Sequence, residues 1–400
     1  MTRVLSVSSS RADGGVLAPV WRGLAVNASA ELHVLLTGMH MVDDAAARGA
    51  LPAGAIVHKA GADLGGGTGP EGSVAAAAAM AAIAEAAART IAKVEPDAVL
   101  VMGDRLDMFP AALAAVPFNL PIVHLHGGEL SLGALDERVR HALTKLSHIH
   151  CVATVEAAER VCRMGEEPWR IHVTGAPGLD GLRQAPPMAA AELQSELGLP
   201  IAGLRLVTVH PETNSEMPAL PLDAVLAALD RSPAPSVFTA PNADPGGAAM
   251  RSRIEAFAGG RPWAAFHDTL GTELYANAMR HAAVMVGNSS SGIIEAGLFD
   301  LPVINVGRRQ EGRLSGPNVH DCRADADAIG RLLDRLSADP LPSTGCRGPG
   351  RSLYGDGRAA PRIVRVLTNL PERRRLLFKR FVQEEARFTA PWEQDIRAAS

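Results

Sequence analysis

Short apolar runs that end in small or polar residues recur along this 400-residue chain, and helical patterns separate them. Continuous apolar strands that alternate with helices are typical of a mostly parallel sheet covered by helices on both faces. The sequence therefore predicts an α/β fold with two doubly wound halves. The runs expected to hold strands cover residues 4–8, 31–37, 96–104, 121–126 and 149–153 in the first half, and 204–209, 236–240, 282–286 and 302–306 in the second.

The two series of strands are separated by Pro186 and Pro187, and a chain of this length suits two domains. We expect one Rossmann-like domain over residues 1–185 and a second over 186–360. The first strand should lead into a polar turn at 9–15 and a helix from about residue 16. The basic pattern at 362–386 predicts a helix with solvated charges, in a segment, 361–400, expected to pack back on the N-terminal domain.

The overall charge excludes some classes of partner. The formal net charge is −4, so nothing in the electrostatics favours nucleic acid or an anionic membrane as a partner. The four cysteines follow no metal-binding or redox spacing, and the N-terminus lacks the pattern of a signal peptide, so we expect a cytoplasmic protein. The alanine-rich run at 74–88 contains Glu85 and is short for a bilayer span, which predicts a buried helix.

One stretch, residues 282–297, combines a buried strand, a turn of small residues and a helix start. Main-chain N–H groups at such a turn converge near the positive end of the helix dipole and can bind a phosphate. We expect Ser289, Ser290, Ser291 and Gly292 to supply these donors, and Glu295 to reach a ribose diol. An ordinary serine-capped turn is the alternative.

Other polar residues follow the predicted strands in both halves. Ligands of doubly wound sheets bind beyond the carboxyl ends of the strands, so this clustering favours the phosphate site over a simple helix cap. If the two halves faced each other, these residues would share one cleft. They are Arg11, Asp104, His126, Glu129, His210 and Asn242.

Several motifs resemble the hydrolysing UDP-N-acetylglucosamine 2-epimerases of sialic-acid-type sugar biosynthesis, over nearly the whole chain and in the family's order. This resemblance implies a GT-B-like fold of two Rossmann-like domains with the nucleotide sugar in an interdomain cleft. One departure is Gly14, where the family usually has an aromatic residue, and we expect it to enlarge or loosen the cleft near the sugar. The motifs are 10–13, 103–105, 124–129, 133–148, 175–180, 210–213, 241–244, 287–295, 309–313 and 354–357.

The implied reaction removes a proton from C2 of the sugar while UDP leaves C1, and water then adds to the resulting glycal. Proton transfer on the two faces of C2 needs paired acid–base groups. Asp104, Glu129 and Asp136 are the candidates, with Glu137 as the alternative to Asp136 and His126 as a possible partner in proton transfer.

The leaving diphosphate needs preorganised positive charge and hydrogen-bond donors. We expect forked contacts from Arg11 and Arg313, a substrate contact from Asn242, and His210 either touching the phosphates or protonating the leaving group.

No cluster has metal-ligand spacing and no G-x-G-x-x-G fingerprint follows the first strand, so we expect no cofactor and no metal. The expected partner is a nucleotide sugar, and the expected assembly is a homodimer or homotetramer. Four alternatives stay open. They are the same chemistry on a UDP- or GDP-linked 2,4-diacetamido-trideoxy sugar, a nonhydrolysing epimerase, a GT-B glycosyltransferase, and a catalytically inactive nucleotide-sugar sensor.

Overall fold

The computed structural model describes residues 1–65, 69–132, 136–212, 217, 219–242, 246–337, 350, 352–383 and 386–392, without the side chains of residues 11, 12, 46, 69 and 70. The chain forms two compact units. Unit 1 comprises Met1–Glu129, Asp136–Gly181 and Tyr354–Ser400, and unit 2 comprises Leu130–Leu135 and Leu182–Leu353.

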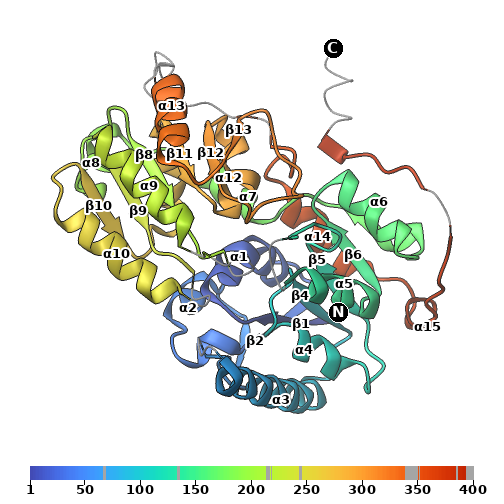
Figure 1. Cartoon of the computed structure of the whole chain (residues 1–400). Helices are drawn as coiled ribbons and strands as arrows, with labels where there is room; N and C mark the ends of the chain where they lie inside the picture. The colour runs from blue at the N-terminus through green and yellow to red at the C-terminus, as the bar shows by residue number, and fades with distance from the viewer. Residues whose placement is uncertain are drawn as a thin grey trace. The chain divides into compact units, whose positions relative to one another are not determined.

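Within the described residues, unit 1 contains a 7-stranded parallel sheet in the order β3-β2-β1-β4-β5-β6-β7 (Figure 1). The order reverses between β1 and β4, which makes that gap the topological switch point of the sheet. The strands are β1 (Thr2–Ser8), β2 (Ala30–Leu36), β3 (Ile56–Lys59), β4 (Ala98–Met102), β5 (Ile122–Leu125), β6 (Ile149–Val152) and β7 (Ile171–Val173).

Successive strand residues point to opposite faces of this sheet, and both faces are apolar. The helices of unit 1 therefore cover both faces. Val4, Leu32 and Leu100 belong to the core that α1 and α14 cover, whereas Leu5 and Leu35 belong to the core under α3, α4 and α5. The helices are α1 (Arg11–Ala25), α2 (Ala45–Ala50), α3 (Gly69–Val94), α4 (Phe109–Ala115), α5 (Asp136–Leu146), α6 (Val155–Arg163), α14 (Ala359–Thr368) and α15 (Arg373–Leu377), with short 3-10 turns at Gly38–Met41 and Pro168–Arg170.

Unit 2 contains a 6-stranded parallel sheet among its described residues, in the order β10-β9-β8-β11-β12-β13. Its switch point lies between β8 and β11. Helix α7 (Gly178–Gln184) spans the point where the chain leaves unit 1. The other elements are β8 (Arg205–Thr208), β9 (Ser236–Thr239), β10 (Ala264–His267), β11 (Val284–Gly287), β12 (Val303–Val306), β13 (Val319–Cys322), α8 (Ala190–Leu197), α9 (Leu220–Arg231), α10 (Gly247–Gly259), α11 (Gly271–His281), α12 (Ser290–Ile294), α13 (Ala326–Ser337) and the 3-10 turn Ala296–Phe299.

The structure confirms the predicted strands and the α/β class, and it corrects the predicted start of the first helix. Helix α1 begins at Arg11, inside the stretch predicted to be a turn. Ser10 caps it, and Asp13 accepts hydrogen bonds from the N–H groups of Ser9 and Ser10, both at 2.8 Å. This capping box offsets the low helix propensity of the glycines that follow.

The alanine-rich helix α3 is less buried than the sequence predicts. One stripe, which includes Ile83, Ala87 and Ile91, packs into the core. Among the described residues, α3 is the one helix that is long and apolar enough, by length and composition, to cross a membrane, over Glu71–Val94. Only 28% of its most apolar stretch is buried. The prediction of a buried helix therefore holds for one face only.

The prediction of one long basic helix over 362–386 is wrong. Helix α14 ends at Thr368, α15 covers five residues, and the described residues after it are not helical. Lys379 leaves the helical path to reach the carbonyl oxygens of Lys145 and Ser147, at 2.7 and 2.6 Å, and the buried carboxylate of Glu166 at 2.8 Å. These contacts satisfy carbonyl acceptors at the end of α5.

Gly287 is a position where only glycine fits. Its φ is +140°, and a Cβ atom there would lie 1.9 Å from the carbonyl oxygen of Thr208. Gly287→Ala should therefore lower the free energy of unfolding by roughly 3 kcal/mol, which chemical denaturation would measure. Gly259→Ala is the matched control, because in the described part of the chain its methyl group would meet no atom within 4 Å outside the neighbouring residues and the backbone of its own helix. Equal stability of the two variants would contradict this account.

Candidate active site

Asp104 lies just beyond β4 and forms an ion pair with Arg140 of α5. The side chain of Arg140 is 2% exposed and that of Asp104 is 19% exposed. A buried guanidinium needs a nearby anion to offset its lost hydration, so the pair holds the β4 turn against α5. Asp104 thus lies beside the helix that carries Asp136.

His126 and Glu129 form a second pair at the end of the adjacent strand, β5. Nδ1 of His126 lies 2.6 Å from Oε1 of Glu129, and Glu129 is 6% exposed. The turn between them is tight, since His126 has a φ of +60° and a Cβ on Gly128 would lie 2.4 Å from the carbonyl oxygen of Ala157. Arg160 of α6 donates a hydrogen bond to the carbonyl oxygen of Gly128 and so fixes the same turn.

His124 joins these two turns from inside β5. Its Nε2 donates to the carbonyl oxygen of Gly103, at 2.8 Å, and its Nδ1 lies 3.4 Å from the hydroxyl of Thr144 in α5. Burial lowers the pKa of His124 to about 3, so its ring is neutral at physiological pH. The ring therefore supports the turn before Asp104 without adding charge.

Asp136 is the first residue of α5 and is partly buried. The neighbouring Glu137 is committed elsewhere, because its Oε1 lies 3.0 Å from Nε2 of His141. Arg11 is the first residue of α1, and its side chain lies outside the described part of the structure. Asp104 thus contacts α5, and His126 contacts Glu129.

In unit 2, three predicted strand ends meet around His210. The side chain of Asn288, after β11, accepts a hydrogen bond from the N–H of His210 at 2.7 Å and donates one to its carbonyl oxygen at 2.9 Å. The N–H of Asn242, after β9, donates to Nδ1 of His210 at 2.9 Å. Burial, and then the nearby charge of Arg309, lower the pKa of His210 to about 3. The imidazole is therefore neutral at physiological pH.

The serine turn is more occupied by its own contacts than expected. Ser289 caps α12, and its Oγ accepts from the N–H of Ser291 at 3.3 Å. The hydroxyl of Ser291 donates to Glu295 at 2.5 Å and lies 2.7 Å from the Tyr275 hydroxyl. The hydroxyl of Ser290 makes no hydrogen bond within the described residues. Helix α12 has five residues, so its dipole is small.

Two other predicted residues have clear positions. Gly292 packs against β12, where an added Cβ would lie 2.9 Å from Cγ1 of Val303. Arg313, in the loop after β12, donates to the hydroxyl of Ser131 at 3.1 Å. In the same loop the N–H groups of Arg308 and Arg309 donate to Oε1 of Glu212, at 2.6 and 3.1 Å.

Several residues that hold the predicted site residues carry no recognisable signal in the sequence. Arg140, Arg160 and the clasp formed by Asn288 are the main cases. Gly14 lies against α2, where an added Cβ would be 3.4 Å from Cα of Ala47, an ordinary van der Waals distance. The expectation that Gly14 enlarges or loosens the cleft near the sugar stays a prediction. Among the described residues, no group of three or more His, Cys, Asp or Glu could hold a metal ion.

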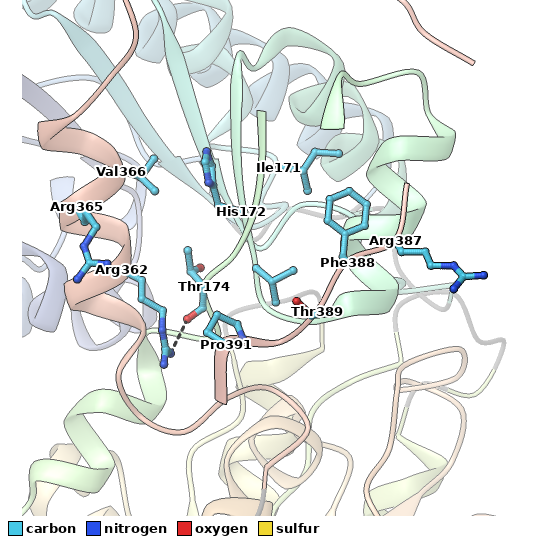
Figure 2. Close-up of a pocket in the computed structure, with 11 residues that line it drawn as sticks. Ile171, His172, Thr174, Arg362, Arg365, Val366, Arg387, Phe388, Thr389 and Pro391 are labelled. Atoms are coloured by element: carbon cyan, nitrogen blue, oxygen red, sulfur yellow. Dashed lines mark hydrogen bonds between the residues drawn. The ribbon is translucent and has the colours of Figure 1, made fainter. Parts of the chain in front are cut away.

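A hollow of about 410 Å³ lies beside β7, and none of the predicted site residues lines it (Figure 2). Arg362 donates across it to the carbonyl oxygen of Thr174, at 3.2 Å, and is paired with Asp356. Figure 2 shows the guanidinium groups of Arg365 and Arg387 on opposite sides of the hollow. Its positive charges therefore do not converge on one point.

Comparison with solved structures supports the fold. The crystal structure of the Neisseria meningitidis UDP-GlcNAc 2-epimerase bound to UDP-GlcNAc aligns with a TM-score of 0.72 and 18% identity, over 92% of this chain and 99% of that one. The Staphylococcus aureus MnaA–UDP structure aligns with a TM-score of 0.70 and 18% identity, over 92% and 96% of the two chains. The two parallel sheets and these alignments thus place this protein in the class of GT-B-like α/β folds.

Comparison of sequences identifies the family. The model of the UDP-N-acetylglucosamine 2-epimerase family matches residues 23–368. A UDP-N,N'-diacetylbacillosamine 2-epimerase (hydrolyzing) of Legionella pneumophila is 37% identical over 71% of this chain and 74% of its own length. A UDP-N-acetylglucosamine 2-epimerase of Neisseria meningitidis is 31% identical over 80% and 83%. The chain belongs to the UDP-N-acetylglucosamine 2-epimerase family and is an enzyme of that family.

Three histidines that the fold keeps neutral predict acid sensitivity. Burial lowers the pKa of His124 and His210 to about 3, and that of His148 to about 4, from an ordinary value of 6.5. Below pH 6.5 the unfolded chain binds protons that the folded chain does not. Stability is therefore highest above pH 6.5 and should fall as the pH drops, by up to about 1.4 kcal/mol per pH unit for each histidine.

Chemical denaturation at a series of pH values between 7.5 and 5 would measure this slope. His148→Asn should make it shallower, because the amide oxygen can replace Nδ1 as the acceptor for the N–H of Ile122, now 3.1 Å away, without titrating. A stability that stays constant over this range would contradict the prediction.

Proposed function

We propose that this enzyme is a hydrolysing 2-epimerase that converts a UDP-linked 2-acetamido sugar to UDP and the free, C2-inverted sugar. The observation that carries the proposal is the arrangement at the ends of β4 and β5. Asp104 and Glu129 follow neighbouring strands, and each is held by its own basic partner, Arg140 and His126. Two separately held carboxylates are what proton transfer on both faces of one carbon requires.

The reaction proceeds in two stages. A carboxylate removes the proton from C2, the C1–O bond breaks, and its electron pair leaves with UDP, which gives a glycal with a C1–C2 double bond. Water then adds its hydroxyl to C1, and C2 receives a proton on the opposite face. We assign these proton transfers to Asp104, Glu129 and Asp136, and place His126 as the group that holds Glu129.

Unit 2 supplies the contacts to the nucleotide in this proposal. His210 and the hydroxyl of Ser290 offer hydrogen bonds, and Arg313 offers positive charge. The main-chain groups of Gly292 and the side chains of Arg11, Asn242, Ser289, Ser291 and Glu295 complete the predicted substrate contacts.

Two sugars fit the proposal. A Campylobacter jejuni GDP/UDP-N,N'-diacetylbacillosamine 2-epimerase (hydrolyzing) is 33% identical over 61% of this chain and 64% of its own length. This relative and the Legionella relative favour a 2,4-diacetamido-trideoxy sugar. UDP-N-acetylglucosamine is the second candidate, because the motifs of the chain and the Neisseria relative support it. Turnover of the two substrates at equal concentration would rank them.

Incubation with each substrate in D2O tests the reaction itself. The expected products are free UDP and a free sugar that carries deuterium at C2, both visible by NMR. Accumulation of an intact UDP-linked sugar inverted at C2 would instead identify a nonhydrolysing epimerase. Release of UDP without deuterium at C2 would contradict the elimination mechanism.

Three substitutions test the acid–base assignment. Asp104→Asn, Glu129→Gln and Asp136→Asn should each lower kcat by ~10²-fold or more and leave UDP affinity nearly unchanged, because the carboxylates act on C2 and not on the nucleotide. Glu85→Gln, at an exposed carboxylate of α3, is the control and should keep full activity. Comparison with Glu137→Gln distinguishes Asp136 from its neighbour. Wild-type rates in all three site variants would refute the assignment.

A further inference from the structure

The ring of His210 is fixed in one tautomer by its hydrogen bonds. A main-chain N–H can only donate, so the bond from the N–H of Asn242 requires a lone pair on Nδ1 of His210. In a neutral imidazole the proton must then be on Nε2. Nε2 makes no hydrogen bond within the described residues of the chain. This nitrogen is therefore a donor that is available to a ligand.

Asn288 fixes the main chain of the same histidine. The β8–β11 ladder ends at the pair Thr208 and Gly287, and the side chain of Asn288 continues it by one further rung. Its amide accepts from the N–H and donates to the carbonyl oxygen of His210, at 2.7 and 2.9 Å. A single planar amide thus satisfies both main-chain groups of one residue, in place of a strand that has ended.

The clasp is itself held rigidly. Asn288 is fully buried, its N–H donates to the carbonyl oxygen of Thr208 at 3.2 Å, and its carbonyl oxygen accepts from Nε2 of Gln310 at 2.8 Å. Among the described residues, Arg309, from the loop after β12, is the charged group that acts on the ring. The neighbours at the ends of β9 and β11 are neutral amides. Nothing in this set favours a protonated ring.

We propose that Asn288 is a positioning residue that, together with the N–H of Asn242, fixes His210 as a neutral donor whose Nε2–H binds the diphosphate of the substrate. This proposal rests on the proposed function. It assigns to His210 one of the two roles that the sequence left open, contact with the phosphates. His210 then acts by hydrogen bonding and does not protonate the leaving group. Its contribution to the reaction is independent of pH in the range where the protein is stable.

NMR of the ¹⁵N-labelled wild-type enzyme tests the tautomer without any variant. The signals of His210, assigned by their loss in His210→Gln, should show a protonated Nε2 and an unprotonated Nδ1, and should not titrate between about pH 5 and 8. Addition of UDP should shift the Nε2–H signal. A protonated Nδ1, a titration near the ordinary value for histidine, or no response to bound UDP would each overturn the proposal.

Two substitutions of His210 separate a donor from an acid. The side-chain amide of Gln can place an N–H near the position of Nε2 but cannot transfer a proton, whereas Asn is too short to reach there. His210→Gln should therefore retain clearly more activity than His210→Asn. Loss of a single donor to a developing charge costs on the order of 10²-fold in kcat, which sets the expected rate of His210→Asn. Equal loss in both variants would favour the acid.

Asn288→Ala tests the positioning role, with Asn277→Ala as the matched control. Asn277 is also fully buried in unit 2, and its amide also clasps main-chain groups, the N–H of Met188 and the carbonyl oxygen of Pro186, at 2.9 and 3.0 Å. Both variants should lose similar stability. Asn288→Ala alone should change the Nε2–H signal of His210 and lower kcat by about tenfold or more.

A change in the His210 signal in both variants, or in neither, would contradict the role of Asn288. The tautomer and the UDP response are measured without turnover. If no UDP-linked sugar is converted while these signals behave as expected, the proposed function fails and the inference about His210 stands.

Discussion

Where a parallel strand ends, its next main-chain N–H and C=O groups have no partner in the sheet. The predicted site residues of unit 1 and of unit 2 both depend on how these groups are satisfied. The ladder satisfies N–H and C=O groups only as far as its last rung, and buried groups beyond it need other partners. In this protein side chains supply them. His124 meets the carbonyl oxygen of Gly103, Arg160 meets that of Gly128, and Asn288 meets both groups of His210. The groups that hold the turns are thus the same groups that orient the predicted catalytic side chains.

The sequence was a good guide to the central strands and a poor one to the edges of the sheets. The apolar runs at 4–8, 98–102 and 284–286 are buried on both faces, and the structure confirms strands there. The four strands that the sequence did not reveal, β3, β7, β10 and β13, all lie at sheet edges. Their residues are mostly half-buried, so their composition carries no continuous apolar signal.

The site residues divide in a similar way into those that the sequence pattern predicts and those that it does not. Polar residues at strand ends were predictable, because parallel strands bring their carboxyl ends to one edge. The partners were not, since Arg140 lies 36 positions from Asp104 and Asn288 lies 78 from His210. A buried arginine inside a helix looks like any solvated helix residue until the fold is known.

Unit 1 is discontinuous along the chain, and this has a consequence for the order of folding. Helix α14 contributes Ile363, Val364 and Leu367 to the same core as β1 and α1, and Lys379 satisfies acceptors at the end of α5. On a ribosome, the residues of unit 2 emerge before these segments. Part of one apolar face of the earlier-made sheet therefore stays uncovered until residues 359–368 have been synthesised. During that interval the nascent chain is the form most exposed to aggregation, and the form for which chaperone assistance matters most.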